Sequence, residues 1–228
     1  PFPAHTGPGG HNASPRAFAR LSIAALHALA RLCMLLKAVG MWPSTLRLGF
    51  IVLLPKPDDG RSPIGPFNPV MRIWMRTRSS LARRWEAMHA RPCLYGGADM
   101  GAQRAAWNVA YRAEAAGLSD EEYAQSLLNL VKAFEKVPHW ALIRSAIKHN
   151  YSLIILRLSL DACRCARTIV INGMCSRLLY ALCGITAGSG FATTELRILV
   201  LDVIDSTYIL WPSIVLAVFV DDFTIEAC

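Results

Sequence analysis

The sequence lacks the features that mark membrane and secreted proteins. No apolar run reaches the roughly 20 uninterrupted residues that a membrane span requires. The run Leu21–Ala30 ends at Arg31, and the run after Glu195 is broken by Arg197. The chain also does not start with a basic segment, an apolar segment and a cleavage site, the pattern of a secretory signal. We therefore expect a soluble protein that is not secreted and has no membrane partner.

The cysteines also indicate neither a metal site nor a set of disulfides. The seven cysteines are an odd number, and their only close spacing is Cys163-x-Cys165, which fits neither a zinc knuckle nor a disulfide framework. Buried, reduced thiols are the better interpretation, and they favour a reducing compartment. We expect an intracellular location, nuclear or cytoplasmic.

Acidic residues are few in this chain. Asp and Glu number 16 against 24 Lys and Arg, so the formal net charge is +8. A hydrophobic fraction of 54% excludes general disorder and allows a real core in 228 residues. The basic excess, with arginines clustered at 72–84, favours a polyanionic partner, and nucleic acid before membrane.

The first half of the chain predicts helices around one short strand. Residues 1–14 are rich in Pro and Gly and indicate a flexible lead-in, and residues 15–45 indicate a helix that packs in the core, capped by Ser14 and ended by Gly40. A short strand followed by turn residues lies in 46–65, and long helices are expected at 70–88 and 100–116. Ser119 to Glu122 has the pattern of a capping box.

The second half predicts strands. "SLLNLVKAF" is a strand candidate, and Pro138 suits the first turn of a helix. Asn172-Gly173 lies between two apolar segments and predicts a hairpin. Ile214 to Val220 is apolar on both faces, as in a buried central strand, and Asp221-Asp222 falls at the turn that ends it.

The adjacent Asp221 and Asp222 predict a cation site. Neighbouring carboxylates repel unless a cation, hydrogen bonds or water offsets the repulsion. Oxygen ligands at a hairpin tip suit Mg²⁺, and paired cations of this kind catalyse nucleotidyl transfer. Such a site needs a third carboxylate from a neighbouring strand.

Four motifs in order resemble the reverse transcriptase domain of non-LTR retrotransposons, from about residue 46 to the end. These are "VLLPKPDDGRSPIG", "LLNLVKAFEKVPHWAL", "VINGMCS" with "GITAGSGFATTELR", and "FVDD". The resemblance implies an α+β fold, the palm and fingers of a right-hand polymerase, with an antiparallel palm sheet and packed helices. Residues 46–117 would be the fingers-like region and 118–228 a truncated palm-like region, with the thumb absent.

The resemblance also assigns residues. Asp221 and Asp222 match the metal-binding pair, which implies Mg²⁺, with Mn²⁺ as the other option. Lys56 and Arg61 match the cations that contact the triphosphate of an incoming nucleotide. Phe134 matches the aromatic that excludes a 2′-hydroxyl, and Gly188 with Ser189 matches the turn beside the nucleotide. The implied partners are an RNA template, a DNA primer and deoxynucleotide triphosphates.

The chain departs from the family pattern at two places. Ala187 replaces the usual Gln, and Asn129 stands where the third metal ligand is an aspartate. An amide brings no negative charge, so Asn129 weakens the metal site. Glu135 is no substitute, since six residues of continuous strand at about 3.3 Å each would place it about 20 Å from Asn129.

Two hypotheses follow. The first is a reverse transcriptase fragment of a retroelement, an RNA-directed DNA polymerase using two-metal nucleotidyl transfer, impaired by Asn129. The second is a catalytically inactive relic that at most binds nucleic acid. An RNA-dependent RNA polymerase or an intron maturase shares the palm chemistry, but Phe134 argues against ribonucleotides. A translated pseudogene without selected function is the remaining reading.

Overall fold

The computed structural model of the chain describes residues 2, 6, 13–55, 57, 60–97, 100–171 and 173–227. Most of the predicted lead-in at 1–14 therefore lies outside the described residues. The chain divides into two compact units, one from residues 1–80 and 134–192 and the other from 81–133 and 193–228. The expected division at residues 45 and 117 stays a prediction.

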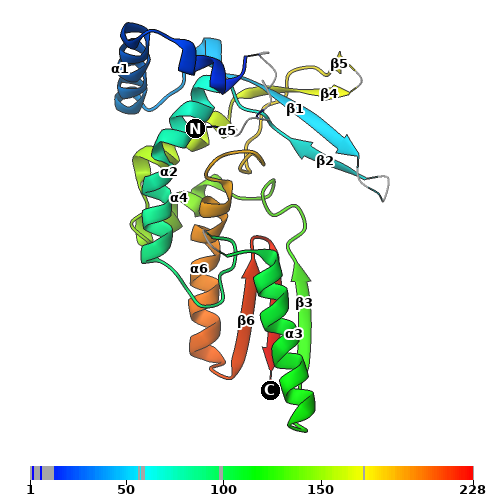
Figure 1. Cartoon of the computed structure of the whole chain (residues 1–228). Coiled ribbons are helices and arrows are strands. Elements are labelled where there is room, and N and C mark those ends of the chain that lie inside the picture. Colours follow the sequence, from blue (N-terminus) through cyan, green and yellow to red (C-terminus); the bar gives the residue numbers. More distant parts are fainter. Residues whose placement is uncertain are drawn as a thin grey trace. The chain divides into compact units, whose positions relative to one another are not determined.

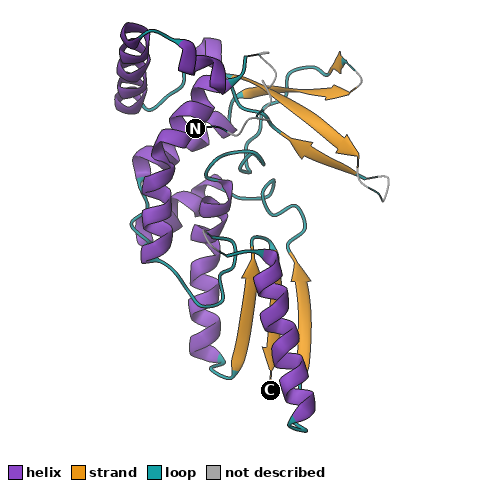
Figure 2. Ribbon diagram, in the orientation of Figure 1, coloured by secondary structure: helices purple, strands orange, loops and turns teal. Residues whose placement is uncertain are grey.

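The first unit contains a four-stranded mixed sheet and several helices (Figures 1 and 2). Its strand order is β2-β1-β4-β5, and only β1 and β4 are parallel to each other. Its elements are η1 (Pro15–Arg20), α1 (Ile23–Val39), η2 (Ser44–Leu46), β1 (Leu48–Pro55), β2 (Arg61–Ile64), the start of α2 (Pro69–Met88), α4 (His139–Lys148), α5 (Leu153–Cys163), β4 (Ala166–Ile171) and β5 (Met174–Cys175).

The second unit contains a three-stranded antiparallel sheet of order β3-β7-β6, with α3 running alongside its strands (Figure 2). An antiparallel sheet is expected for residues 118–228, and β3, β6 and β7 form one, whereas β4 and β5 of the same range join β1 in the mixed sheet. Its elements are the end of α2, α3 (Ala102–Leu118), β3 (Ala124–Asn129), α6 (Ala192–Leu210), β6 (Ile214–Phe219) and β7 (Asp222–Ala227). The chain as a whole is therefore a mixed α+β protein.

The turn predictions are confirmed. The strand and the turn expected at 46–65 are present, and β1 pairs antiparallel with β2 across that turn, with Val52 opposite Ile64. Ile171 pairs with Met174, so the Asn172-Gly173 segment joins two antiparallel strands; Gly173 has φ +79°, and Asn172 lies outside the described residues. A positive φ is what a two-residue hairpin turn requires.

The N-terminal helix differs from its prediction. Ser14 caps η1, and Gly40 ends α1 with φ +73°, as expected. The helix is interrupted, however: η1 ends before Leu21, and Ser22 caps a separate helix, α1. Core packing was the wrong expectation for α1, because Leu36 is the one residue of this helix that is buried. Sequence periodicity identified the helix but overestimated how much of it is covered.

Three further expectations are corrected. Ser119 ends α3 and is followed by a strand, so the capping box does not form. β3 stops at Asn129, so the continuous strand on which the separation from Glu135 was estimated does not exist. β6 is an edge strand, and β7 is the central one. β6 is nevertheless buried, because Val218 donates a backbone hydrogen bond to Cys93 and accepts one from Tyr95.

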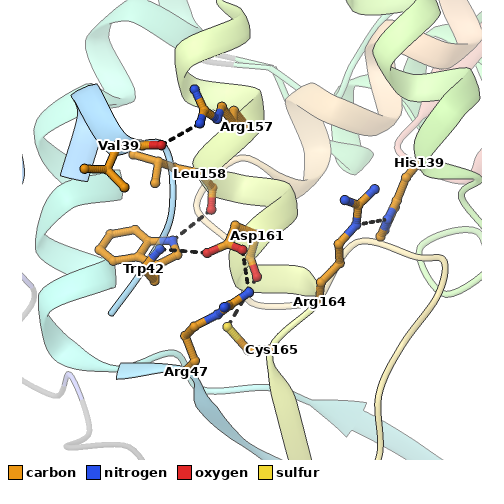
Figure 3. Close-up of polar contacts among 9 residues, drawn as sticks. All are labelled: Val39, Trp42, Arg47, His139, Arg157, Leu158, Asp161, Arg164 and Cys165. Carbon is orange, nitrogen blue, oxygen red and sulfur yellow. Dashed lines mark hydrogen bonds and ion pairs between the residues drawn. The ribbon is translucent and has the colours of Figure 1, made fainter. Parts of the chain in front are cut away.

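A chain of aromatic rings lies in the core of the first unit. Trp42 contacts Trp74 edge to face with ring centroids 5.7 Å apart, and Trp74 contacts Phe191 in the same way at 5.9 Å. Asp161 of α5 fixes Trp42 by accepting its backbone N–H at 2.7 Å, and it also pairs with Arg47 at 2.7 Å (Figure 3). This carboxylate ties the segment after α1 to α5.

Buried side chains of α6 and of β6 form part of the core of the second unit. Ile198, Leu201 and Ile204 of α6 are fully buried. Arg91 donates two hydrogen bonds of 2.8 and 2.9 Å to Asp205, a bidentate geometry that holds the segment before α3 against α6.

Among the described helices of both units, none is long and apolar enough to cross a bilayer.

Candidate catalytic site

The hairpin of β6 and β7 presents the aspartate pair. Phe219 pairs with Asp222, so Val220 and Asp221 form the two-residue turn. Val220 has φ +60°, an unfavourable conformation for a β-branched residue that costs about 1–3 kcal/mol. A side chain at Gly96 would approach the Val220 methyl group to 3.3 Å, so Gly96 leaves the space that Val220 occupies. The tip is thus held by packing.

Asn129 lies directly opposite Asp222 in the sheet. The register of β3 and β7 pairs these two residues, and Asn129 Nδ2 donates a hydrogen bond of 2.7 Å to Asp222 Oδ1. Leu130 then donates its backbone N–H to the Asp221 carbonyl at 3.0 Å. The three residues that the sequence predicted at the metal position are therefore brought together within the second unit.

The direction of this hydrogen bond matters for cation binding. An ionised carboxylate only accepts hydrogen bonds, so Asn129 must turn its NH₂ group, and not its carbonyl oxygen, toward Asp222. A cation on that Asp222 oxygen would meet an N–H group. In the described part of the chain, no group of three or more His, Cys, Asp or Glu side chains is placed to hold a metal ion.

Arg61 lies at the start of β2 in the first unit. It pairs with Pro55 across the β1–β2 ladder, and its side chain is exposed. A solvated guanidinium at the end of a strand is free to grip phosphate oxygens. Its predicted companion Lys56 lies outside the described residues.

The glycine turn also belongs to the first unit. Gly188 has φ +106°, and a Cβ there would lie 3.0 Å from the Gly65 carbonyl oxygen. The Gly65 N–H donates to the Ala187 carbonyl oxygen at 3.2 Å, and the Ser189 N–H donates to the Thr186 carbonyl oxygen at 2.9 Å. The turn that carries Gly188 and Ser189 is thus tied to the end of β2 and requires glycine for this close approach.

Phe134 connects to the same glycine-rich segment. Its carbonyl accepts the Ile185 N–H at 2.8 Å, and its side chain is half-buried. Gly184 has φ +88°, and a Cβ there would lie 2.6 Å from the Glu135 carbonyl oxygen. A cavity of about 290 Å³ opens beside these segments. Its lining includes Pro63, Gly65, Glu135, Arg167 and Thr186.

Sequence reasoning missed the residue that fixes this turn. His139 Nε2 donates to the Gly184 carbonyl at 2.7 Å, while His139 Nδ1 accepts from Arg164 at 3.0 Å (Figure 3). Nδ1 must be unprotonated to accept, so the imidazole is neutral. Burial lowers the pKa of His139, in agreement with this assignment, although the bond to Gly184 opposes the shift. No local pattern in the sequence signals this contact.

Sequence reasoning also missed a buried carboxylate in β7. Glu226 is fully buried and accepts hydrogen bonds from Arg112 of α3 and, at 2.6 Å, from Tyr123. The available signal was an acidic residue inside an apolar strand, because charged side chains are almost never fully buried unless paired. This cluster fixes α3 to the sheet whose other end carries Asp222.

Solved telomerase structures resemble this chain. An apo telomerase from Candida tropicalis, truncated from its C-terminal domain, aligns with a TM-score of 0.54 and 12% identity over 80% of this chain and 44% of the telomerase chain. Telomerase from Candida albicans in complex with a TWJ fragment of telomeric RNA aligns with a TM-score of 0.56 and 12% identity, over 82% and 39%. The chain has a polymerase-like fold.

A third structure supports the same fold. Telomerase from Candida tropicalis in complex with a TWJ fragment of telomeric RNA aligns with a TM-score of 0.55 and 13% identity over 89% of this chain and 39% of its own. This chain therefore spans about two fifths of the telomerase chains it matches. No protein-family model and no curated protein matches the sequence. At this level of identity the comparison shows a shared fold between this chain and part of telomerase.

Proposed function

We propose that this chain is the fingers and palm segment of a retroelement reverse transcriptase of the non-LTR kind, in which Asn129 impairs nucleotidyl transfer. The ancestral reaction is attack of a primer 3′-hydroxyl on the α-phosphate of a deoxynucleotide, with loss of pyrophosphate and an RNA strand as template. Arg61 and Lys56 would hold the triphosphate, and Phe134 would exclude ribonucleotides. The Gly188-Ser189 turn would lie beside the nucleotide.

The observation that supports this proposal most strongly is the strand register, which sets Asn129 opposite Asp222 at the "FVDD" tip. A carboxylate at residue 129 would complete a three-carboxylate group with Asp221 and Asp222 without any change in backbone. The polymerase-like fold supports the same assignment. The register supports a metal site in which one ligand, at residue 129, is changed.

The residues as they stand do not fit a two-metal centre. Mg²⁺ gives up its water reluctantly and relies on anionic oxygens. Here two carboxylates remain, and one of them already accepts an amide N–H at 2.7 Å. The ligands present therefore do not support a two-metal step in this chain. Loss of a ligand of this kind costs about 10²-fold to 10⁴-fold in rate.

The second candidate function is nucleic-acid binding without catalysis, and the distribution of charge favours it. The first unit carries 17 Lys and Arg residues against 4 Asp and Glu, a net charge of +13. Exposed basic side chains bind phosphates regardless of whether a metal is present. Binding to an RNA–DNA hybrid should then need no Mg²⁺ and should weaken steeply with salt.

Primer extension on an RNA template tests the first proposal. Asn129→Asp should raise synthesis with Mg²⁺ or Mn²⁺ by about 10²-fold or more over the parent chain. Adding Asp221→Ala to that variant should abolish the gain. Ser126→Asp is the matched control, because it adds a carboxylate at an exposed position of β3 that pairs with Ile225 and lies away from the tip.

The effect of Mg²⁺ on the melting temperature separates the polymerase candidate from the binding-only candidate. In Asn129→Asp, Mg²⁺ should raise the melting temperature, because the cation relieves the repulsion among three carboxylates. If Asn129→Asp neither binds Mg²⁺ nor extends a primer, the polymerase assignment of the tip is wrong. Salt-dependent hybrid binding that persists in that case would support the second candidate alone.

A further inference from the structure

The outer face of α3 carries a row of exposed apolar side chains. Trp107, Tyr111 and Leu118 expose 76%, 72% and 84% of their surfaces. At 100° per residue these three and Glu114 fall within an arc of about 60° on one side of the helix. Their 4-3-4 spacing is that of a helix–helix seam. Exposed aromatic side chains of this size, gathered in one row, mark an interaction surface.

This row faces away from the contacts that hold α3 in place. Ala105 and Val109 pack against Ala217 of the sheet, and Arg112 bonds to Glu226. By contrast, within the described part of the chain the side chains of Trp107, Tyr111 and Glu114 make no hydrogen bond or ion pair. A partner can therefore bind to this row without breaking the contacts that hold α3 in the second unit.

The charges along this face differ between its two ends. Arg104, on the same side of the helix, is the exposed cation at the N-terminal end. Asp120, Glu121 and Glu122 are exposed just beyond the C-terminal end, where Glu121 N–H turns back to bond the Ala116 carbonyl at 3.0 Å. A surface that is positive at one end and negative at the other is complementary to itself when reversed.

We propose that α3 pairs antiparallel with α3 of a second copy of this chain. A two-fold axis crossing the helix between Arg112 and Ala113 sets Trp107 against Leu118 of the second copy. It also sets Tyr111 against Glu114, so that the phenol O–H donates to the carboxylate. Arg104 then meets Glu121 of the second copy. Each contact occurs twice, as an isologous interface requires.

The same geometry disfavours the other occupants. A single-stranded nucleic acid would stack bases on Trp107 and Tyr111, but it would meet Glu114 and the acidic end. In a parallel helix pair, Glu114 would face Glu114 and the acidic ends would face each other. The antiparallel second copy satisfies Glu114 and both helix ends, and it sets the two helix dipoles in opposite directions.

The expected dimer is weak. The three apolar side chains expose on the order of 400 Å² together. This is about half of the roughly 800 Å² per partner of a standard interface. Since affinity depends on well-packed aromatic anchors more than on area, we expect a monomer–dimer equilibrium in the micromolar range.

Sedimentation velocity over about 1 to 100 µM of the 228-residue chain tests this pairing. Trp107→Ala should raise the dissociation constant at least tenfold. Trp140→Ala is the matched control, because Trp140 lies on α4 of the first unit and is 69% exposed. It should leave the equilibrium unchanged. Circular dichroism and thermal melting confirm that each variant is folded.

A charge swap gives the sharper test. Arg104→Glu alone and Glu121→Arg with Glu122→Arg should each weaken the dimer, and all three changes together should restore it, because the exchanged charges again meet across the two-fold axis. A chain that stays monomeric over the whole range would overturn the proposal. So would a dimer that ignores Trp107→Ala, or a triple variant that fails to recover.

Discussion

The two units carry opposite charge. The first has 17 basic and 4 acidic residues, while the second has 7 basic and 12 acidic residues, a net charge of −5. The overall charge of +8 hides this division. It teaches that attraction for a polyanion is concentrated in the unit with the mixed sheet. The unit that carries Asp221 and Asp222 is instead net acidic, a charge that favours cations and basic groups over a polyanion.

A buried carboxylate organises each unit, but in different ways. Asp161 in the first unit accepts a backbone N–H and pairs with a half-buried arginine, and its side chain is 13% exposed. Glu226 in the second unit is fully buried between Arg112 and Tyr123. Because desolvation is more complete around Glu226, removing it should have the larger consequence.

The largest expected effect is therefore that of Glu226→Ala. It leaves Arg112 and Tyr123 facing a void in the core, which should cost about 3–5 kcal/mol. Hydrogen exchange should show β6 and β7 amides losing protection, with β1 and β4 unchanged. Glu226→Gln should lose less stability than Glu226→Ala but more than the parent chain. The exposed Glu122→Ala is the control and should leave stability unchanged. Equal loss in both sheets would show that the units do not unfold separately.

A smaller effect tests the charge division directly. Arg61→Ala in the first unit should lower hybrid affinity and reduce the log–log salt slope by about 1, because one phosphate contact is lost. Arg104→Ala removes the same charge from the second unit and should leave the slope unchanged at concentrations where the chain is monomeric. If both variants lower the slope alike, binding follows the total charge and not the first unit.

Local chemistry explains which features the sequence predicted. Gly40, Gly173 and the turn of the β6–β7 hairpin are determined by residues close by in the sequence, so local patterns predicted them without knowledge of the fold. The bond between Asn129 and Asp222 joins residues 93 positions apart and depends on strand register. The family resemblance supplied the importance of these residues, whereas local patterns could not show that they pair.

The misjudged features share a cause. The apolar pattern of α1 predicted core packing, but burial depends on what covers a helix, and no local pattern carries that information. β6 was expected in the centre of its sheet because both faces are apolar. It lies at the edge, and the segment of Cys93 and Tyr95 covers it through Val218. Long-range pairing decided both outcomes.

The smallest expected effect concerns pH and the first unit alone. The neutral His139 accepts from Arg164 through Nδ1, and protonation would replace that acceptor with an N–H facing a cation. Burial lowers the pKa of His139 below its ordinary 6.5, so the unfolded chain takes up a proton first as the pH falls. The full stability should be present above pH 6.5 and should decline as the pH falls through the lowered pKa.

His139→Gln isolates this contribution. A glutamine amide can still donate to the Gly184 carbonyl and accept from Arg164, but it does not titrate. Thermal melts between pH 8 and about pH 5 should show a smaller acid-induced decrease in the variant than in the parent. Exchange of the β6 and β7 amides should be alike in both proteins, because His139 belongs to the other unit. An equal decrease in parent and variant would mean that another group governs the acid sensitivity.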